Sequence, residues 1–85
     1  MHYNIINAAC LRDYKIFVEF ADGKKGVIDL EDKVGRGGVF LPLAEKQYFC
    51  KMKLDKELGT ITWENGADLS PEFLYERLMQ AKEIN

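Results

Sequence analysis

The stretch WENGADLSPEFLYERL, residues 63–78, decides the fold because it ends a strand and begins a helix within sixteen residues. Asn65-Gly66 is a pair that readily adopts the positive φ of a tight turn, so it ends the strand before it. Ser70 can cap a helix with its side-chain oxygen, and Pro71 suits the first helical position because that position needs no backbone N–H. Glu72 then lies near the positive end of the helix dipole. The stretch therefore predicts a strand, a turn and a helix in that order.

The predicted helix runs from Pro71 to about Lys82 and is amphipathic. One stripe of apolar side chains is made by Leu74, Leu78 and Ala81, and Phe73, Tyr75 and Met79 widen it. Glu72, Glu76, Gln80 and Glu83 face away from this stripe. A helix with one apolar face must bury it against another element, and the strands upstream supply that element.

The first third of the chain reads as a three-stranded meander over residues 3–30. Residues 14–20, YKIFVEF, alternate apolar and polar side chains with the period of two of a half-buried strand. Asp22-Gly23 follows as a hairpin turn, and residues 26–30 form the return strand. Residues 3–11 are apolar and compatible with a strand, and Arg12-Asp13 is the expected turn after them.

The middle of the chain is less regular. Residues 31–41 contain three glycines in four positions, which predicts a loop with one helical turn at its start. Pro42 then begins a short helix over 43–49. A strand is expected from Cys50 to Leu54, where apolar residues alternate with Lys51, Lys53 and Asp55, and it forms a hairpin with the strand over 60–64. The layout predicts one α+β domain, residues 1–85, with a mostly antiparallel sheet (a three-stranded meander plus a hairpin) packed against the C-terminal helix.

Composition narrows the protein's class and compartment. Of the 85 residues 47% are apolar and 31% are charged, which is typical of a globular chain. No apolar run is long enough to span a bilayer, and the N-terminus lacks the pattern of a signal peptide, so we expect a cytoplasmic protein with no membrane partner. In that compartment Cys10 and Cys50 are expected to be reduced core residues and not a disulfide.

The familiar catalytic and cofactor motifs do not fit. The glycines of residues 35–38 lack the third glycine of a dinucleotide fingerprint and the Lys-Ser/Thr of a phosphate loop. His2 is the only histidine, and the two cysteines lie far apart, so a structural zinc site is not expected. The net charge of −2 argues against direct nucleic-acid binding. We therefore expect no catalytic, cofactor-binding or metal-binding residues and no cofactor.

Two functions remain as hypotheses. The leading one is a non-enzymatic protein-interaction or regulatory module with a protein partner, and self-association through an open sheet edge is a further expectation. The alternative is a small-ligand binder or minor enzyme with a cleft near Gly35–Gly38 and Trp63–Asp68. The candidate interface or ligand residues are Arg36, Asn65, Asp68, Tyr75 and Glu76. Tyr75 and Glu76 have no structural role that the sequence reveals.

Two motifs point to a family. The run GGVFLPL at residues 37–43 and the run WENGADLSPEFLYE at residues 63–76, with the earlier FADGK, resemble a widespread bacterial family known as a domain of unknown function. The resemblance implies a small α+β protein, found alone or fused to a helix-turn-helix segment. Because this chain ends at Asn85 without such a segment, no DNA reading is implied. The resemblance also implies a partner encoded nearby, as in toxin–antitoxin pairs, and it brings no established catalytic residues.

Overall fold

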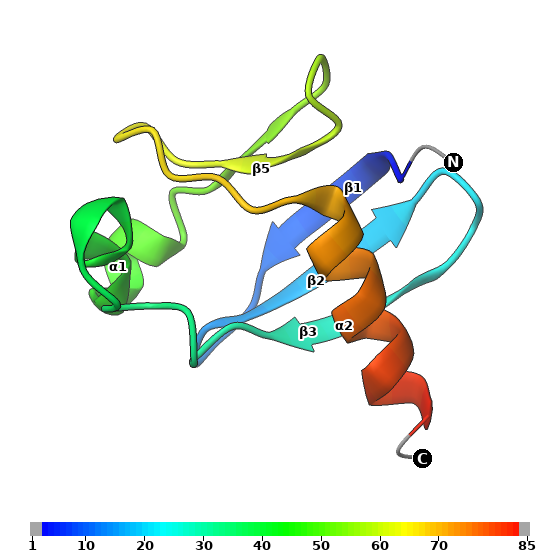
Figure 1. The fold of residues 1–85 in the computed structure, drawn as a ribbon, viewed down its shortest axis with the longest axis horizontal. Coiled ribbons are helices and arrows are strands. Elements are labelled where there is room, and N and C mark those ends of the chain that lie inside the picture. The colour runs from blue at the N-terminus through cyan, green and yellow to red at the C-terminus, as the bar shows by residue number, and fades with distance from the viewer. Residues whose placement is uncertain (1–2, 84–85) are drawn as a thin grey trace.

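The computed structural model describes residues 3–83, except for the side chains of residues 82–83, and confirms the α+β class. Three strands, β1 (Ile5–Cys10), β2 (Lys15–Phe20) and β3 (Lys25–Asp29), form an antiparallel sheet in the order β1-β2-β3 (Figure 1). A second sheet is the hairpin of β4 (Lys53–Asp55) and β5 (Thr60–Thr62). The helix α2 (Pro71–Glu83) packs on the larger sheet. His2, the only histidine of the sequence, lies outside the described residues.

The meander forms where the sequence predicted it, with one local difference. In its register Phe17 is paired with Ala9 on one side and with Val27 on the other. The turn before β2 is tighter than expected, because Asp13 and Tyr14 have φ values of 54° and 65°. Tyr14 therefore lies in the turn and not in the strand, and its hydroxyl donates to the carbonyl oxygen of Ala44.

The middle segment is broken into short helical turns. Two 3₁₀ turns, η1 (Gly38–Phe40) and η2 (Pro42–Ala44), precede the one-turn helix α1 (Lys46–Phe49). The single helix predicted over 43–49 is therefore interrupted, because Glu45 has the extended backbone angles φ −81° and ψ 119°. One helical turn was predicted at the start of the loop over residues 31–41. The 3₁₀ turn η1 lies instead near the end of that loop.

The second hairpin is confirmed, but its first strand is shorter than predicted. Cys50 ends α1 with φ −76° and ψ 0°, and the strand begins only at Lys53. Gly59 closes the turn with φ 68°, and its carbonyl oxygen accepts a bond of 2.9 Å from the N–H of Ile5. This bond joins the hairpin to the start of β1.

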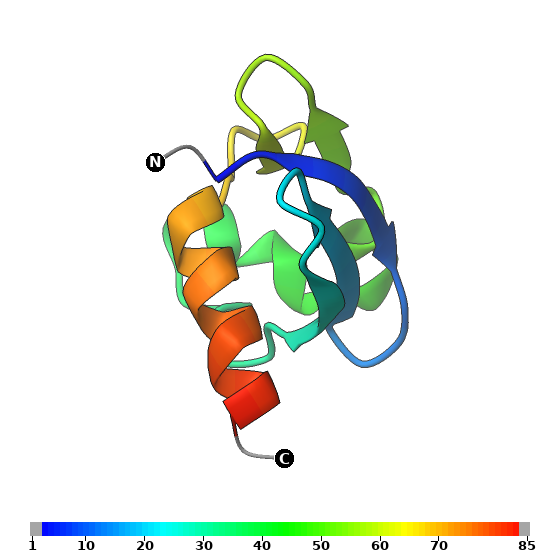
Figure 2. The ribbon, with the colours of Figure 1, turned by 90° about the vertical axis from the view of Figure 1, so that its right-hand side faces the viewer.

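The helix α2 begins as the sequence indicates. The hydroxyl oxygen of Ser70 accepts bonds from the N–H groups of Glu72 and Phe73, at 3.2 and 3.4 Å. Leu74 and Leu78 are fully buried on its inner face. The core that they enter combines residues of both sheets and of α1: Ile16, Val18, Phe20, Ile28, Leu30, Phe49, Ile61 and Trp63. The helix thus covers the inner face of the large sheet (Figure 2).

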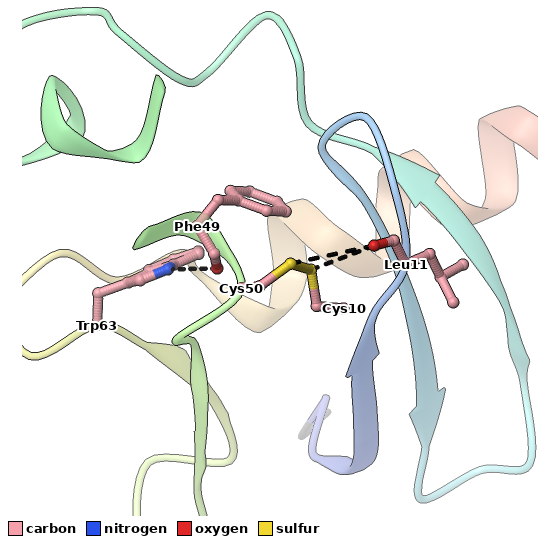
Figure 3. Close-up of a disulfide and its surroundings, with 5 residues drawn as sticks. All are labelled: Cys10, Leu11, Phe49, Cys50 and Trp63. Carbon is pink, nitrogen blue, oxygen red and sulfur yellow. Dashed lines mark hydrogen bonds between the residues drawn. A yellow bond between two sulfur atoms is a disulfide. The ribbon is translucent and has the colours of Figure 1, made fainter. Parts of the chain in front are cut away.

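The two cysteines correct a prediction, because they form a disulfide (Figure 3). Cys10 is half-buried and Cys50 is exposed, so neither is a fully buried core residue. The predicted strand would have directed Cys50 inward, whereas the end of α1 places it beside the end of β1, with 5.3 Å between the two Cα atoms. That separation is ordinary for a bridged pair. Composition and expected compartment could not predict that Cys10 and Cys50, 40 residues apart in sequence, lie side by side.

The disulfide lies between the exposed Leu11 and the buried residues Phe49 and Trp63. The carbonyl oxygen of Leu11 lies 3.5 Å from the sulfur of Cys10 and 4.0 Å from that of Cys50. A bridged sulfur carries no hydrogen, so in the disulfide these are close contacts and not hydrogen bonds. On the other side of Cys50, the indole N–H of Trp63 donates to the carbonyl oxygen of Phe49 at 2.9 Å.

In residues 3–83 we find no helix with the length and apolar character that crossing a membrane requires.

Candidate functional site

Asn65 lies in the turn that it was expected to form, and its side chain also hydrogen-bonds the glycine-rich loop. Its side-chain oxygen accepts a bond of 3.1 Å from the N–H of Ala67, and its amide donates to the carbonyl oxygen of Val39 at 2.8 Å. Gly66 supplies the positive φ of 93°. Both polar ends of the Asn65 side chain are therefore engaged in holding two segments together.

Arg36 and Asp68 are both exposed, and each contacts a residue within its own segment. The Nε–H of Arg36 donates to the carbonyl oxygen of Asp32 at 2.9 Å, a contact within its own loop. Asp68 forms an isolated antiparallel bridge with Thr62, which continues the pairing of β5. The structure thus gives Asp68 a backbone role and leaves its side chain at the surface.

Tyr75 has a structural role that the sequence did not reveal. Its hydroxyl donates to a carboxylate oxygen of Asp22 at 2.7 Å. Its ring lies 4.6 Å from the ring of Tyr3 and 5.0 Å from that of Phe20, centre to centre. Tyr75 therefore fastens α2 to the turn between β2 and β3.

The same hydrogen bond shifts the titration of both partners. The bond from Tyr75, with a further bond from the backbone N–H of Lys24, lowers the pKa of Asp22 below its ordinary value. The bond to Asp22, together with desolvation, raises the pKa of Tyr75. Each shift favours the state in which a phenol donates to a carboxylate.

Arg77 was not predicted, although among the described side chains of α2 it makes the most extensive polar contacts. Its guanidinium donates to both carboxylate oxygens of Asp32 and, at 3.0 Å, to the carbonyl oxygen of Asp29. It also lies over the ring of Phe73, 4.8 Å from the ring centre. The bond from Arg77 lowers the pKa of the Asp32 carboxyl. The only signal in the sequence was an arginine four residues after Phe73 on a helix, which does not identify a partner 45 residues away.

The five predicted residues do not gather around one cleft. Glu76 is exposed and borders a small hollow of about 160 Å³ with Phe73, Arg77 and Gln80. Two other hollows, of about 480 and 340 Å³, are lined by none of the five. Asn65 contacts the loop before α1, whereas Tyr75 contacts the turn after β2 (Figure 1). The cleft of the alternative hypothesis therefore gains no support from these contacts.

In the larger of those hollows the single cationic side chain is already engaged. The hollow is lined by Asp29, Glu31, Asp32 and Arg77, and the guanidinium there is already bound to its carboxylate neighbour. Nor do residues 3–83 contain a group of His, Cys, Asp or Glu side chains placed to hold a metal ion.

The surface that the sequence reasoning missed is the outer face of the β1-β2-β3 sheet, the face opposite α2. It presents three rows of cross-strand neighbours, which follow from the register. The middle row is Ala9, Phe17 and Val27. One flanking row is Leu11, Lys15 and Asp29, and the other is Asn7, Glu19 and Lys25. We call these nine residues the outer sheet face.

The middle row is apolar yet faces away from the core. Phe17 is half-buried, and Val27 keeps 46% of its surface exposed. None of the three residues packs against the buried cluster beneath the sheet. The flanking rows are charged on β2 and β3, and Lys15 lies 4.0 Å from Asp29. The outer sheet face is thus an apolar strip between two rows of mixed charge on a rigid element.

Comparison with known proteins places the chain in a family of unknown function. Neither a curated protein nor a solved structure matched this chain. One family model, described as "Protein of unknown function (DUF2442)", matches residues 5–80. This span includes all of β1–β5 and most of α2. The chain therefore belongs to the DUF2442 family, a family of proteins of unknown function.

Proposed function

We propose that this protein is a non-enzymatic interaction module that binds a protein through its outer sheet face. The observation that carries the proposal is the apolar middle row, Ala9, Phe17 and Val27, on the solvent side of the sheet. An antiparallel sheet with one wet face ordinarily places polar side chains there. Contiguous apolar residues with a polar rim are the usual composition of a protein-binding surface.

The rigidity of the strip supports the same proposal. Phe17 lies on the central strand, between two hydrogen-bonded neighbours, and the residues next to it in sequence, Ile16 and Val18, are fully buried. An aromatic side chain on a fixed backbone loses little conformational entropy when a partner covers it. By contrast, the exposed Val39 and Leu41 lie in the irregular segment before α1, and the exposed Leu58 lies in the turn between β4 and β5.

A regulatory role, in which the chain controls a second protein as an antitoxin does, is the finer form of this proposal. It requires that the partner occupy the outer sheet face in a stoichiometric complex. The partner would be encoded nearby, as the family resemblance implies.

The test is site-specific photo-crosslinking in the native cell. A photoreactive amino acid at position 27 lies on the outer sheet face, and the same amino acid at the exposed position 80 of α2 is the matched control. We expect a defined protein adduct at position 27 and none at position 80. Equal or absent crosslinking at the two positions would contradict the proposal.

A further inference from the structure

We infer that the outer sheet face binds a second copy of this chain, related to the first by a two-fold axis along the row Ala9–Phe17–Val27. This inference rests on the proposed function and names a second copy as the occupant of the face, in place of the separate protein that the regulatory form requires. The evidence is the order of charges along two adjacent strands, which makes the face complementary to itself.

The charge pattern is the same on both strands when each is read along the chain. On β2 the outward residues are Lys15, Phe17 and Glu19, which are basic, apolar and acidic. On β3 they are Lys25, Val27 and Asp29, in the same order. Because the strands are antiparallel, each flanking row contains one basic and one acidic residue side by side.

A two-fold axis along the middle row exchanges the two flanking rows. Lys15 then faces Glu19 of the second copy, and Asp29 faces Lys25 of the second copy. Both contacts join opposite charges, and symmetry repeats each of them, so four complementary contacts surround the apolar strip. Phe17 lies at the centre of this arrangement, where aromatic side chains contribute most to binding.

The other aligned two-fold arrangement is unfavourable. An axis along the strands would place Lys15 against Lys15 and Glu19 against Glu19 of the second copy. Like charges brought together in this way oppose binding. The charge pattern therefore selects one of the two geometries in which twisted sheets pack face to face in an aligned manner.

The size of the face sets the strength to expect. Three strands about 4.8 Å apart and roughly five residues long give a footprint of about 14 by 17 Å. This is below the area of a standard stable interface, so we expect a reversible, concentration-dependent dimer in the micromolar range or weaker. Among the described elements, α2 packs on the inner side of the sheet, and the β4–β5 hairpin lies beside β1 (Figure 2).

The first test is sedimentation equilibrium of the full chain from about 5 μM to 1 mM, where the average mass should rise toward twice the monomer mass. Two charge reversals, Lys15→Glu and Glu19→Lys, are then measured alone and mixed. Each variant alone brings like charges together at two symmetry-related contacts, so its dimer should weaken about tenfold or more. In the equimolar mixture each introduced charge meets an opposite one, so a heterodimer should form with near wild-type affinity.

The mixture also controls for folding, because a variant that has merely lost its structure cannot regain binding from another. Far-ultraviolet circular dichroism of each variant verifies the fold independently. A wild-type chain that stays monomeric to 1 mM, or a mixture no tighter than its components, overturns the inference. Photo-crosslinking at position 27 separates the failure of this inference from the failure of the proposed function. An adduct with a different protein supports the interaction module and rejects the dimer. The absence of any adduct rejects both.

Discussion

Loss of the Cys10–Cys50 disulfide should remove a large part of the stability of this protein. The bond closes a loop across a sequence separation of 40 residues. Closing a loop of that length in the unfolded chain is worth about 4 kcal/mol in the chain-entropy model. A chain of this length typically unfolds with a free energy of about 4–13 kcal/mol, so the bond accounts for a third or more of the expected total.

The change to make is Cys50→Ser, because Cys50 is exposed and a serine hydroxyl can remain in water there. Cys10→Ser is less suitable, since Cys10 is half-buried against the core. A loss of 4 kcal/mol corresponds to a fall of about 16–32 °C in the melting temperature of a chain this small. Residual structure in the unfolded chain makes this an upper value.

Thermal unfolding followed by circular dichroism measures the effect, with and without a phosphine reductant. The oxidised wild-type chain should melt highest, and reductant should lower its melting temperature to that of Cys50→Ser. The variant itself should not respond to reductant. Mass spectrometry after alkylation confirms which samples contain the bond.

Two results would refute this reasoning. Oxidised and reduced wild-type chains with melting temperatures within about 2 °C would show that the cross-link does not limit the unfolded state. Two alkylated thiols in the air-oxidised native protein would show that the bond does not form at all.

Three further predictions follow from single contacts. Gly59→Ala should lower the free energy of unfolding by more than the roughly 1–2 kcal/mol cost of positive φ, because its Cβ would lie 2.4 Å from the side-chain oxygen of Asn4. In Gly23→Ala the added Cβ meets no atom within 4 Å, so this variant should show the cost of positive φ alone. Urea unfolding of the two variants measures the difference. Leu74→Ala should cost about 2–5 kcal/mol by leaving a cavity, measured in the same way. Tyr75→Phe should destabilise at pH 7, and that deficit should shrink as acid titrates Asp22 below its ordinary pKa of 3.8; an unchanged deficit at pH 2 would exclude the bond.

The sign of the pH effect follows from the direction of each shift. The pKa of Asp22 is lowered by folding, so its contribution is present above 3.8 and is lost as the pH falls through the folded value. The pKa of Tyr75 is raised, so its contribution is present below 10.0 and is lost as the pH rises through the folded value. The deficit of Tyr75→Phe should therefore be greatest between these limits.

The elements were predictable where one local cause dominated. The alternation in β2, the turn at Asn65-Gly66 and the cap at Ser70 each depend on residues within four positions, and all three were confirmed. The predictions failed where a distant partner decided. Tyr14 lies in a turn and not in the predicted strand, and its hydroxyl contacts a residue 30 positions away. Cys50 ends α1 and is not part of the predicted strand.

The candidate residues show the same division. Asn65 and Tyr75 were recognised as unusual, but their partners, Val39 and Asp22, lie 26 and 53 residues away in the chain. Arg77 and the outer sheet face were missed. Phe17 and Val27 looked like ordinary strand residues until the register placed them in one row.

The sequence by itself determined most of the strands and turns and the C-terminal helix of this protein, because spacing, capping and glycine conformations act over a few residues. Only the tertiary structure decided which cysteines meet, what Tyr75 and Arg77 bind, and which charges lie side by side on the outer sheet face. The physical reason is that these contacts join residues 6–53 positions apart, and their formation depends on the packing of the whole core.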